Sequence, residues 1–87
     1  MSAYRRSPRA VWRASTGMLV AAVPPNPPTR IAGSAALVWG QLAEPVTLDE
    51  LVDRLAHQTG VAGETLRPDV AALLAQLQPL GLVEAVR

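Results

Sequence analysis

The chain has 87 residues, a length that suits one small domain. It contains no cysteine, which excludes disulfide bonds, a thiol nucleophile and a thiolate metal site. The eight basic residues are all arginine and are nearly balanced by seven acids, so the net charge is only +1. Four of the arginines fall within the first thirteen residues, which leaves the remainder net acidic. Nucleic-acid-binding domains usually concentrate basic charge on one face, and this composition argues against that class.

The N-terminal part of the chain predicts a flexible tail followed by a hairpin. Residues 1–8 are polar and rich in arginine, and we expect them to be loosely attached to a single domain over 9–86. Residues 9–14 contain Trp and Val in an alternating pattern that favours a strand. The Ser-Thr-Gly sequence at 15–17 is typical of a turn, and the apolar run at 18–23 predicts the second strand.

A cluster of prolines interrupts the chain after this hairpin. Four of the five residues at 24–28 are proline, which cannot donate to a strand ladder, so we expect a stiff connector. The sequence Thr29-Arg30-Ile31 then predicts a brief third strand. The apolar run at 17–23 follows an arginine-rich start, as in a signal peptide, but we interpret it as a buried strand. No apolar run approaches the length of a membrane span.

Two short helices are expected next. Ser34 is placed to cap a helix that runs to about Leu42, with Leu37, Val38 and Trp39 toward the core.

The pair Thr47 and Glu50 has the spacing of a capping box, which predicts a helix from Leu48 to about Gln58. Its apolar residues recur at helical spacing, and Gly60 is expected to end it.

The third helix is predicted to be the longest. Thr65 is a candidate cap, and Pro68 would then lie in the first turn, where its missing N–H is tolerated. Gly81 is expected to stop the helix, and residues 82–86 to form a closing strand. Its apolar stripe is Leu66, Val70, Leu73, Leu74, Leu77 and Leu80. The predicted fold class is therefore α+β and winged-helix-like, with an N-terminal three-stranded antiparallel sheet followed by three helices.

The sequence contains no catalytic constellation that we can identify. His57 is the only histidine, and we interpret it as a surface or capping residue near a helix end. The acids Asp49, Glu50 and Asp53 cluster where a helix begins, and the helix dipole accounts for them. We find no phosphate-binding loop, nucleophile elbow or metal-spaced set. We therefore predict no enzyme activity, no catalytic residues, no metal and no cofactor.

The order of elements and three segments resemble one known family. The segments are "RIAGSAALVWGQL", "VTLDELVDRLAHQTG" and "LRPDVAALLAQLQPLGLVE". They are similar to the PqqD-like family, named for a protein of pyrroloquinoline quinone biosynthesis, whose fold is also called the RiPP recognition element. The best-matching positions are Asp69, Val70, Leu73, Leu77, Gly81, Leu82 and Val83.

The resemblance implies a stand-alone, cytoplasmic peptide-binding module that acts as a peptide chaperone in natural product biosynthesis. Such domains bind the leader of a ribosomally made precursor peptide by strand addition. They present it to a maturation enzyme such as a protease, a cyclase or a radical SAM enzyme. Neither nucleic acid nor a membrane is expected as a partner.

The family's mode of binding places the groove between the third strand and the third helix. On the strand, this implies Thr29, Arg30 and Ile31 as peptide-binding residues, because an unpaired edge can accept a further strand.

On the third helix, a projection at 100° per residue centres Leu66, Val70, Leu73 and Leu77 on the core, and the adjoining flank is Arg67, Ala71, Leu74 and Gln78. Ala71 and Leu74 would form a shallow pocket, with Leu74 alternatively a plain core residue. Arg67 would pair an acidic leader residue or remain a solvated charge.

Two other classes of function stay open at this point. A winged helix that binds DNA would insert its third helix into the major groove, but that helix carries one arginine and one acid. A strand-edge oligomerisation module would pair its free edge with a second copy.

Overall fold

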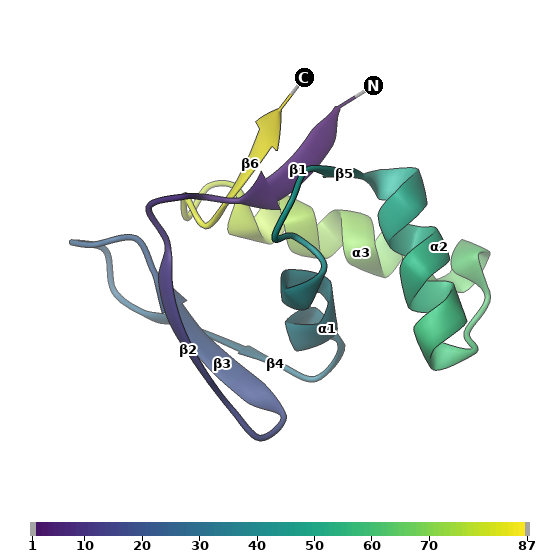
Figure 1. Ribbon diagram of the computed structural model, residues 1–87, viewed down its shortest axis with the longest axis horizontal. Coiled ribbons are helices and arrows are strands. Elements are labelled where there is room, and N and C mark those ends of the chain that lie inside the picture. Colours follow the sequence, from purple (N-terminus) through teal and green to yellow (C-terminus); the bar gives the residue numbers. More distant parts are fainter. Residues whose placement is uncertain (1, 87) are drawn as a thin grey trace.

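The computed structural model describes residues 2–86 and contains three helices and two three-stranded antiparallel sheets (Figure 1). The predicted α+β class, with a three-stranded sheet followed by three helices, is confirmed. The elements are β1 (Ala3–Arg6), β2 (Val11–Ser15), β3 (Met18–Ala22), β4 (Thr29–Ala32), α1 (Ser34–Gly40), β5 (Val46–Thr47), α2 (Leu48–Thr59), α3 (Gly63–Leu77) and β6 (Val83–Val86).

The predicted hairpin and third strand form one sheet in the order β2-β3-β4. Ser15 lies opposite Met18 across a two-residue turn, in which Gly17 has a φ of 73° that glycine adopts without strain. The proline cluster forms the loop before β4, as expected. Leu19 faces Ile31 in the register between β3 and β4, and both side chains are buried.

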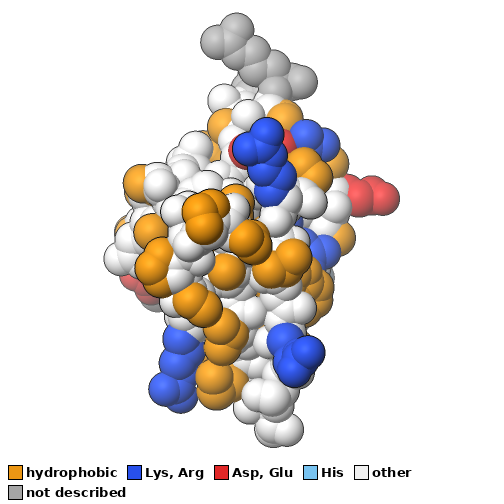
Figure 2. Space-filling view, turned by 90° about the vertical axis from the view of Figure 1, so that its left-hand side faces the viewer, with side chains coloured by type: hydrophobic (Ala, Val, Ile, Leu, Met, Phe, Trp, Pro, Cys, Tyr) orange, Lys and Arg blue, Asp and Glu red, His pale blue; other side chains and the backbone are white. Residues whose placement is uncertain are grey.

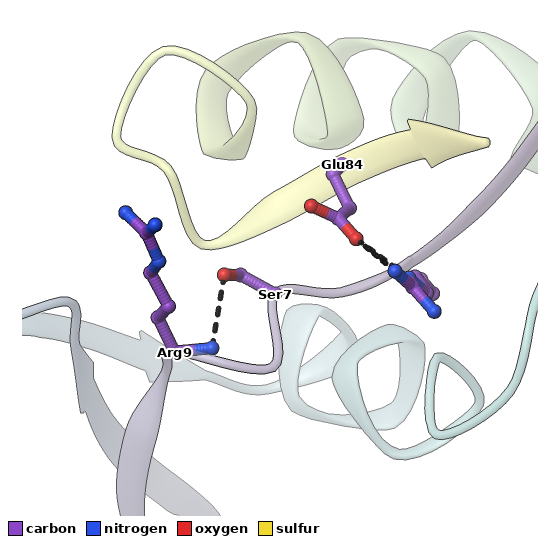
Figure 3. A network of polar contacts seen from close by, with 4 residues as sticks. Ser7, Arg9 and Glu84 are labelled. Atoms are coloured by element: carbon purple, nitrogen blue, oxygen red, sulfur yellow. Dashed lines mark hydrogen bonds and ion pairs between the residues drawn. The ribbon is translucent and has the colours of Figure 1, made fainter.

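A second sheet, in the order β5-β1-β6, brings the two ends of the chain together. The prediction of a flexible tail over 1–8 is therefore wrong, because residues 3–6 form β1. Its hydrogen-bonding partners lie about 40 and 80 residues away in the chain, so no local pattern reveals it. The Arg5 side chain also contacts a carboxylate oxygen of Glu84 on β6 at 2.6 Å (Figure 3).

Helix α1 differs from its prediction at both its cap and its exposed side. Its N-cap is Gly33 and no side chain caps it, so Ser34 is the first helical residue rather than the cap. The buried side centres on Val38 and Trp39, which leaves Leu37 at the margin with 46% of its surface exposed. The prediction that Leu37 faces the core is wrong.

Helix α2 confirms its predicted ends. The Thr47 hydroxyl accepts a hydrogen bond from the Glu50 backbone N–H at 3.2 Å, and the Glu50 carboxylate accepts one from the Thr47 N–H at 3.1 Å. The hydrogen bond from the Thr47 backbone N–H lowers the pKa of the Glu50 carboxyl, and the Thr47 side chain lowers it further by a smaller amount. Gly60 ends the helix in the left-handed conformation at φ 74°.

Helix α3 begins earlier than predicted. Its N-cap is Ala62, so Thr65 is not the cap, and Pro68 is the sixth helical residue rather than part of the first turn. Gly63, the first residue of the helix, packs against α2: a Cβ placed on it would lie 3.1 Å from Val52, so glycine lets the two helices approach closely.

The end of α3 is also earlier than the apolar stripe indicates. Pro79 has no N–H to continue the ladder, and the helix ends at Leu77. Leu80, which the stripe includes, therefore lies beyond the helix and is 44% exposed. The closing strand is confirmed as β6.

The helices cover one face of the sheet β2-β3-β4 and leave the other uncovered. Leu19, Ala21 and Ile31 on the inner face are buried, whereas Val20 and Arg30 on the outer face are exposed. The largest fully buried side chains are Trp39, Leu42, Leu51, Leu82 and Val46. Among the residues described, no helix has both the length and the apolar character needed to cross a bilayer.

We expect Thr47→Ala to lower the free energy of unfolding by about 1 kcal/mol, because it removes the side-chain acceptor of the capping box. Thr65→Ala is the matched control, since Thr65 is an exposed residue within α3 and caps nothing, and we expect a change within about 0.5 kcal/mol. Urea denaturation of both variants measures the difference. Equal effects would show that the capping box does not stabilise α2.

Candidate functional site

The free edge of β4 is the first component of the candidate site. The N–H of Gly33 donates to the carbonyl oxygen of Gly17 at 3.3 Å, which shows which main-chain groups of this strand point toward β3. Because main-chain groups alternate in direction along a strand, Thr29 and Ile31 also face β3. The N–H and C=O groups of Arg30 and Ala32 therefore point away from the sheet, and within residues 2–86 no strand pairs with them.

A pocket of about 300 Å³ lies where this edge leads into α1. Ser34 and Ala35, at the start of α1, form one wall, and the Leu37 side chain is its exposed apolar surface. The other walls come from α2 and α3. The lining residues are Ser34, Ala35, Leu37, Val38, Leu55, Thr59, Leu66, Asp69, Val70, Ala72, Leu73 and Gln76. A mostly apolar hollow with few polar groups suits one apolar side chain.

A second pocket, of about 370 Å³, lies at the opposite end of β4. It is formed by the proline loop, by Thr29 and by residues after α3, including Pro79 and Leu80. Residues from Leu66 to Gln76 of α3 line the first pocket, and the segment that follows α3 lines the second. The two pockets therefore bracket the free edge of β4.

The strand residues predicted for the site have different surroundings. Arg30 is exposed and its main chain points outward, as an edge contact requires. Thr29 lies half-buried beside the second pocket. Ile31 is 3% exposed, with its side chain in the core and its main chain toward β3. Of the three residues, Arg30 is the one whose main chain is open to a partner, and the adjacent open residue is Ala32.

The predicted flank of α3 is not the side that lines the pocket. Leu74 is 2% exposed and belongs to the core, so it is not part of an exposed flank. Its neighbours Arg67, Ala71 and Gln78 are exposed, but none of them lines the first pocket. The buried side of α3 centres on Val70, Leu74 and Leu77. The pocket-facing residues Asp69, Leu73 and Gln76 lie on the other side of this buried stripe from the predicted flank.

Arg67 has a partner within the protein. Its guanidinium donates to a carboxylate oxygen of Asp49 at 2.5 Å, and both side chains are about half exposed. An exposed ion pair of this kind contributes little to stability, and it leaves Arg67 less available to an acidic ligand. As peptide contacts, Arg67, Ala71 and Gln78 stay predictions.

The sequence interpretation missed the residues that line the pocket. The sequence places Leu37 in the core and gives no reason to include Asp69, Leu73 or Gln76 in the site. The spacing of Asp69, Leu73 and Gln76, at three and four residues, does mark one side of a helix. The sequence does not show that α1 packs against this side of α3.

Trp12 of β2 and Trp39 of α1 pack against each other, and Arg6 of β1 lies against both rings. The rings of Trp12 and Trp39 meet edge to face at 6.1 Å, and the Arg6 guanidinium lies 4.9 Å from the Trp12 ring and 5.7 Å from that of Trp39. Trp39 is fully buried, which confirms its predicted place in the core. Trp12 is 47% exposed and covers it.

Groups capable of chemistry are scattered. His57 Nδ1 lies 3.1 Å from the backbone carbonyl oxygen of Asp53, as expected for a residue near a helix end. In the described part of the chain, no three His, Cys, Asp or Glu side chains are grouped in a way that could hold a metal ion.

The fold and the site therefore define a small α+β domain with an open strand edge between two apolar pockets. Comparison with protein families matches residues 27–83 to the model of "Coenzyme PQQ synthesis protein D (PqqD)". The chain belongs to the PqqD family, which confirms the resemblance. The match runs from the proline loop through β4 and all three helices to the start of β6. No curated protein and no solved structure matches the chain.

We expect Leu74→Ala to lower the free energy of unfolding by about 2–5 kcal/mol, because it leaves a cavity in the core. Arg67→Ala is expected to change it by less than about 1 kcal/mol, because its ion pair is exposed. Chemical denaturation distinguishes the two. A Leu74→Ala variant as stable as the wild type would show that Leu74 is not part of the core.

Proposed function

We propose that this protein is a non-catalytic module that binds the leader of a ribosomally made precursor peptide. The leader adds as a further strand to β4, and the module presents it to a maturation enzyme in the cytoplasm, where such precursors are made. The observation that carries this proposal is the open edge of β4 between two apolar pockets. Membership of the PqqD family supports it, since the family name refers to the synthesis of a coenzyme.

The edge of β4 supplies the main-chain part of the affinity. Arg30 and Ala32 each offer one N–H and one C=O, so an antiparallel peptide can form up to four hydrogen bonds with them. Each contributes about 0.5–1.5 kcal/mol net. This contribution depends little on the leader's sequence, and the pockets must supply the selectivity.

The first pocket indicates what kind of leader residue is selected. Leu37 and Leu73 offer apolar surface, and burial of one leucine-sized side chain contributes about 1.5–3 kcal/mol. Asp69 is the one charged residue of the lining. A basic leader residue beside the apolar anchor suits this carboxylate.

The surroundings of α3 favour a peptide over DNA as the ligand. This helix carries a single arginine, Arg67, which Asp49 already engages, and Asp69 is exposed nearby. A helix in the major groove would need several cations for phosphate contacts. Pairing of β4 with a second copy of the chain remains the competing use of the edge, and the experiment below separates it.

We expect Ala32→Pro to weaken leader binding about tenfold or more, because it removes an outward N–H of β4 without touching the bonds to β3. The matched control is Ala14→Pro on β2. Ala14 also points its main chain away from β3, at the other edge of the sheet, so we expect unchanged binding. Fluorescence anisotropy with the labelled leader of the cognate precursor peptide measures both.

A second variant tests the same site without a proline, so that a folding defect in Ala32→Pro cannot be mistaken for loss of the binding site. Leu37→Ser removes apolar surface from the pocket at a half-exposed position, so it should weaken leader binding while circular dichroism stays unchanged. Loss of binding in Ala14→Pro but not in Ala32→Pro would place the peptide at β2 instead. Sedimentation that shows a dimer abolished by Ala32→Pro would assign the edge to self-association.

A further inference from the structure

The outer face of the sheet β2-β3-β4 carries a row of side chains that the leader site does not use. Arg13 lies opposite Val20, and Val20 lies opposite Arg30, so the three stand side by side across the three strands. Their immediate neighbours Leu19 and Ile31 point to the buried face, and alternation places this row on the face away from the helices. Nothing among residues 2–86 covers it.

The centre of this outer face is apolar and slightly hollowed. Val11 is 57% exposed and Val20 is 38% exposed. With Ala22 and Pro28 they border a shallow depression of about 400 Å³, and Arg13 lies at its rim. Figure 2 views the molecule from the side on which this sheet and the proline loop lie. Apolar side chains gather in the middle of that view, and basic side chains flank its lower part.

Charge is segregated between the sheet and the helices. Residues 1–43 contain five arginines and no acid, a charge of +5, whereas residues 44–87 contain three arginines and seven acids, a charge of −4. In the described part of the chain, the ion pairs are Arg5 with Glu84 and Arg67 with Asp49, so Arg13 and Arg30 remain uncompensated. An apolar centre between uncompensated cations complements an apolar patch bordered by acids.

We propose that the outer face of the sheet β2-β3-β4 is the docking surface for the maturation enzyme, a folded protein that presents acidic side chains around an apolar one. This rests on the proposed function, because it assigns the enzyme to a different surface from the leader. The two surfaces do not compete: the leader extends the sheet in its plane at β4, and the enzyme covers the sheet from its outer side.

The dimensions of the face indicate the strength of docking. Three strands about 4.8 Å apart and about five residues long span roughly 14 by 17 Å. That is well below the about 800 Å² per partner of a stable complex, so docking on this face is transient. A leader added to β4 widens the face by one strand, which favours docking of the loaded form over the empty one.

Other occupants fit this face less well. Two copies packed face to face would bring Arg13 and Arg30 of each close to those of the other, which is unfavourable between like charges. Single-stranded nucleic acid is held by aromatic stacking together with many phosphate contacts. Trp12 also lines the depression, but Arg13 and Arg30 are two cations only, too few for a strand of phosphates.

The test uses the full chain, saturated with leader, and the purified enzyme that matures the same precursor peptide. We expect Arg13→Glu to weaken enzyme binding about tenfold or more, measured by biolayer interferometry. Arg54→Glu is the matched control: it makes the same change of charge at an exposed site on α2, and should change binding less than about threefold. Both variants should bind the leader as the wild type does.

The outcomes separate this inference from the proposed function. If wild-type protein binds the leader but Arg13→Glu and Arg54→Glu bind the enzyme equally well, the docking surface is wrong and the leader site stands. If wild-type protein does not bind the leader, the proposed function fails first. Two other results would also overturn the docking surface, because each gives it another occupant. One is binding of a single-stranded oligonucleotide at physiological salt that Arg13→Glu abolishes, and the other is a dimer that Arg13→Glu abolishes.

Discussion

The register between β3 and β4 is the constraint on which the rest of the molecule depends. A shift by one residue would turn every side chain of β4 to the opposite face and exchange its inward and outward main-chain groups. Leu19 and Ile31 prevent that shift, because they lie opposite each other and are both buried, at 5% and 3% exposure. The same pairing leaves Arg30 and Ala32 open at the edge. Core packing thus determines which atoms are available for binding.

This single sheet offers two surfaces with different physical properties. Its edge is polar main chain beside apolar pockets, which suits an extended peptide that brings its own strand. Its outer face is apolar and positively charged, which suits a folded and acidic surface. Because an edge and a face are perpendicular, both can be occupied at once. A module with separate surfaces for peptide and enzyme can hold the two together without any chemistry of its own.

The sequence predicted those elements whose determinants are local. The capping box of Thr47 and Glu50, the turn at Gly17 and the stop at Gly60 depend on neighbours within a few residues, and all three were found. Strand β1 depends on partners about 80 residues away, and Gly63 at the start of α3 packs against Val52 of α2. Neither contact leaves a local pattern.

The candidate site was predictable to a similar degree. Resemblance to the family pointed to β4, whose edge is open in the structure. The pocket residues on α3 were missed because they lie on the other side of the buried stripe from the assumed flank: Asp69, Leu73 and Gln76 line the pocket, whereas Arg67, Ala71 and Gln78 do not. A 100° projection cannot resolve two adjacent leucines, since either one completes the apolar stripe.

Hydrogen exchange of individual backbone amides, with and without the leader peptide, tests the central claim most directly. If the leader adds to β4, the amides of Arg30 and Ala32 must slow markedly when it binds, because they acquire acceptors they lack in the free protein. The outward amides of Trp12 and Ala14 on β2 should exchange as before. Protection of Trp12 and Ala14 with no change at Arg30 and Ala32 would contradict the account.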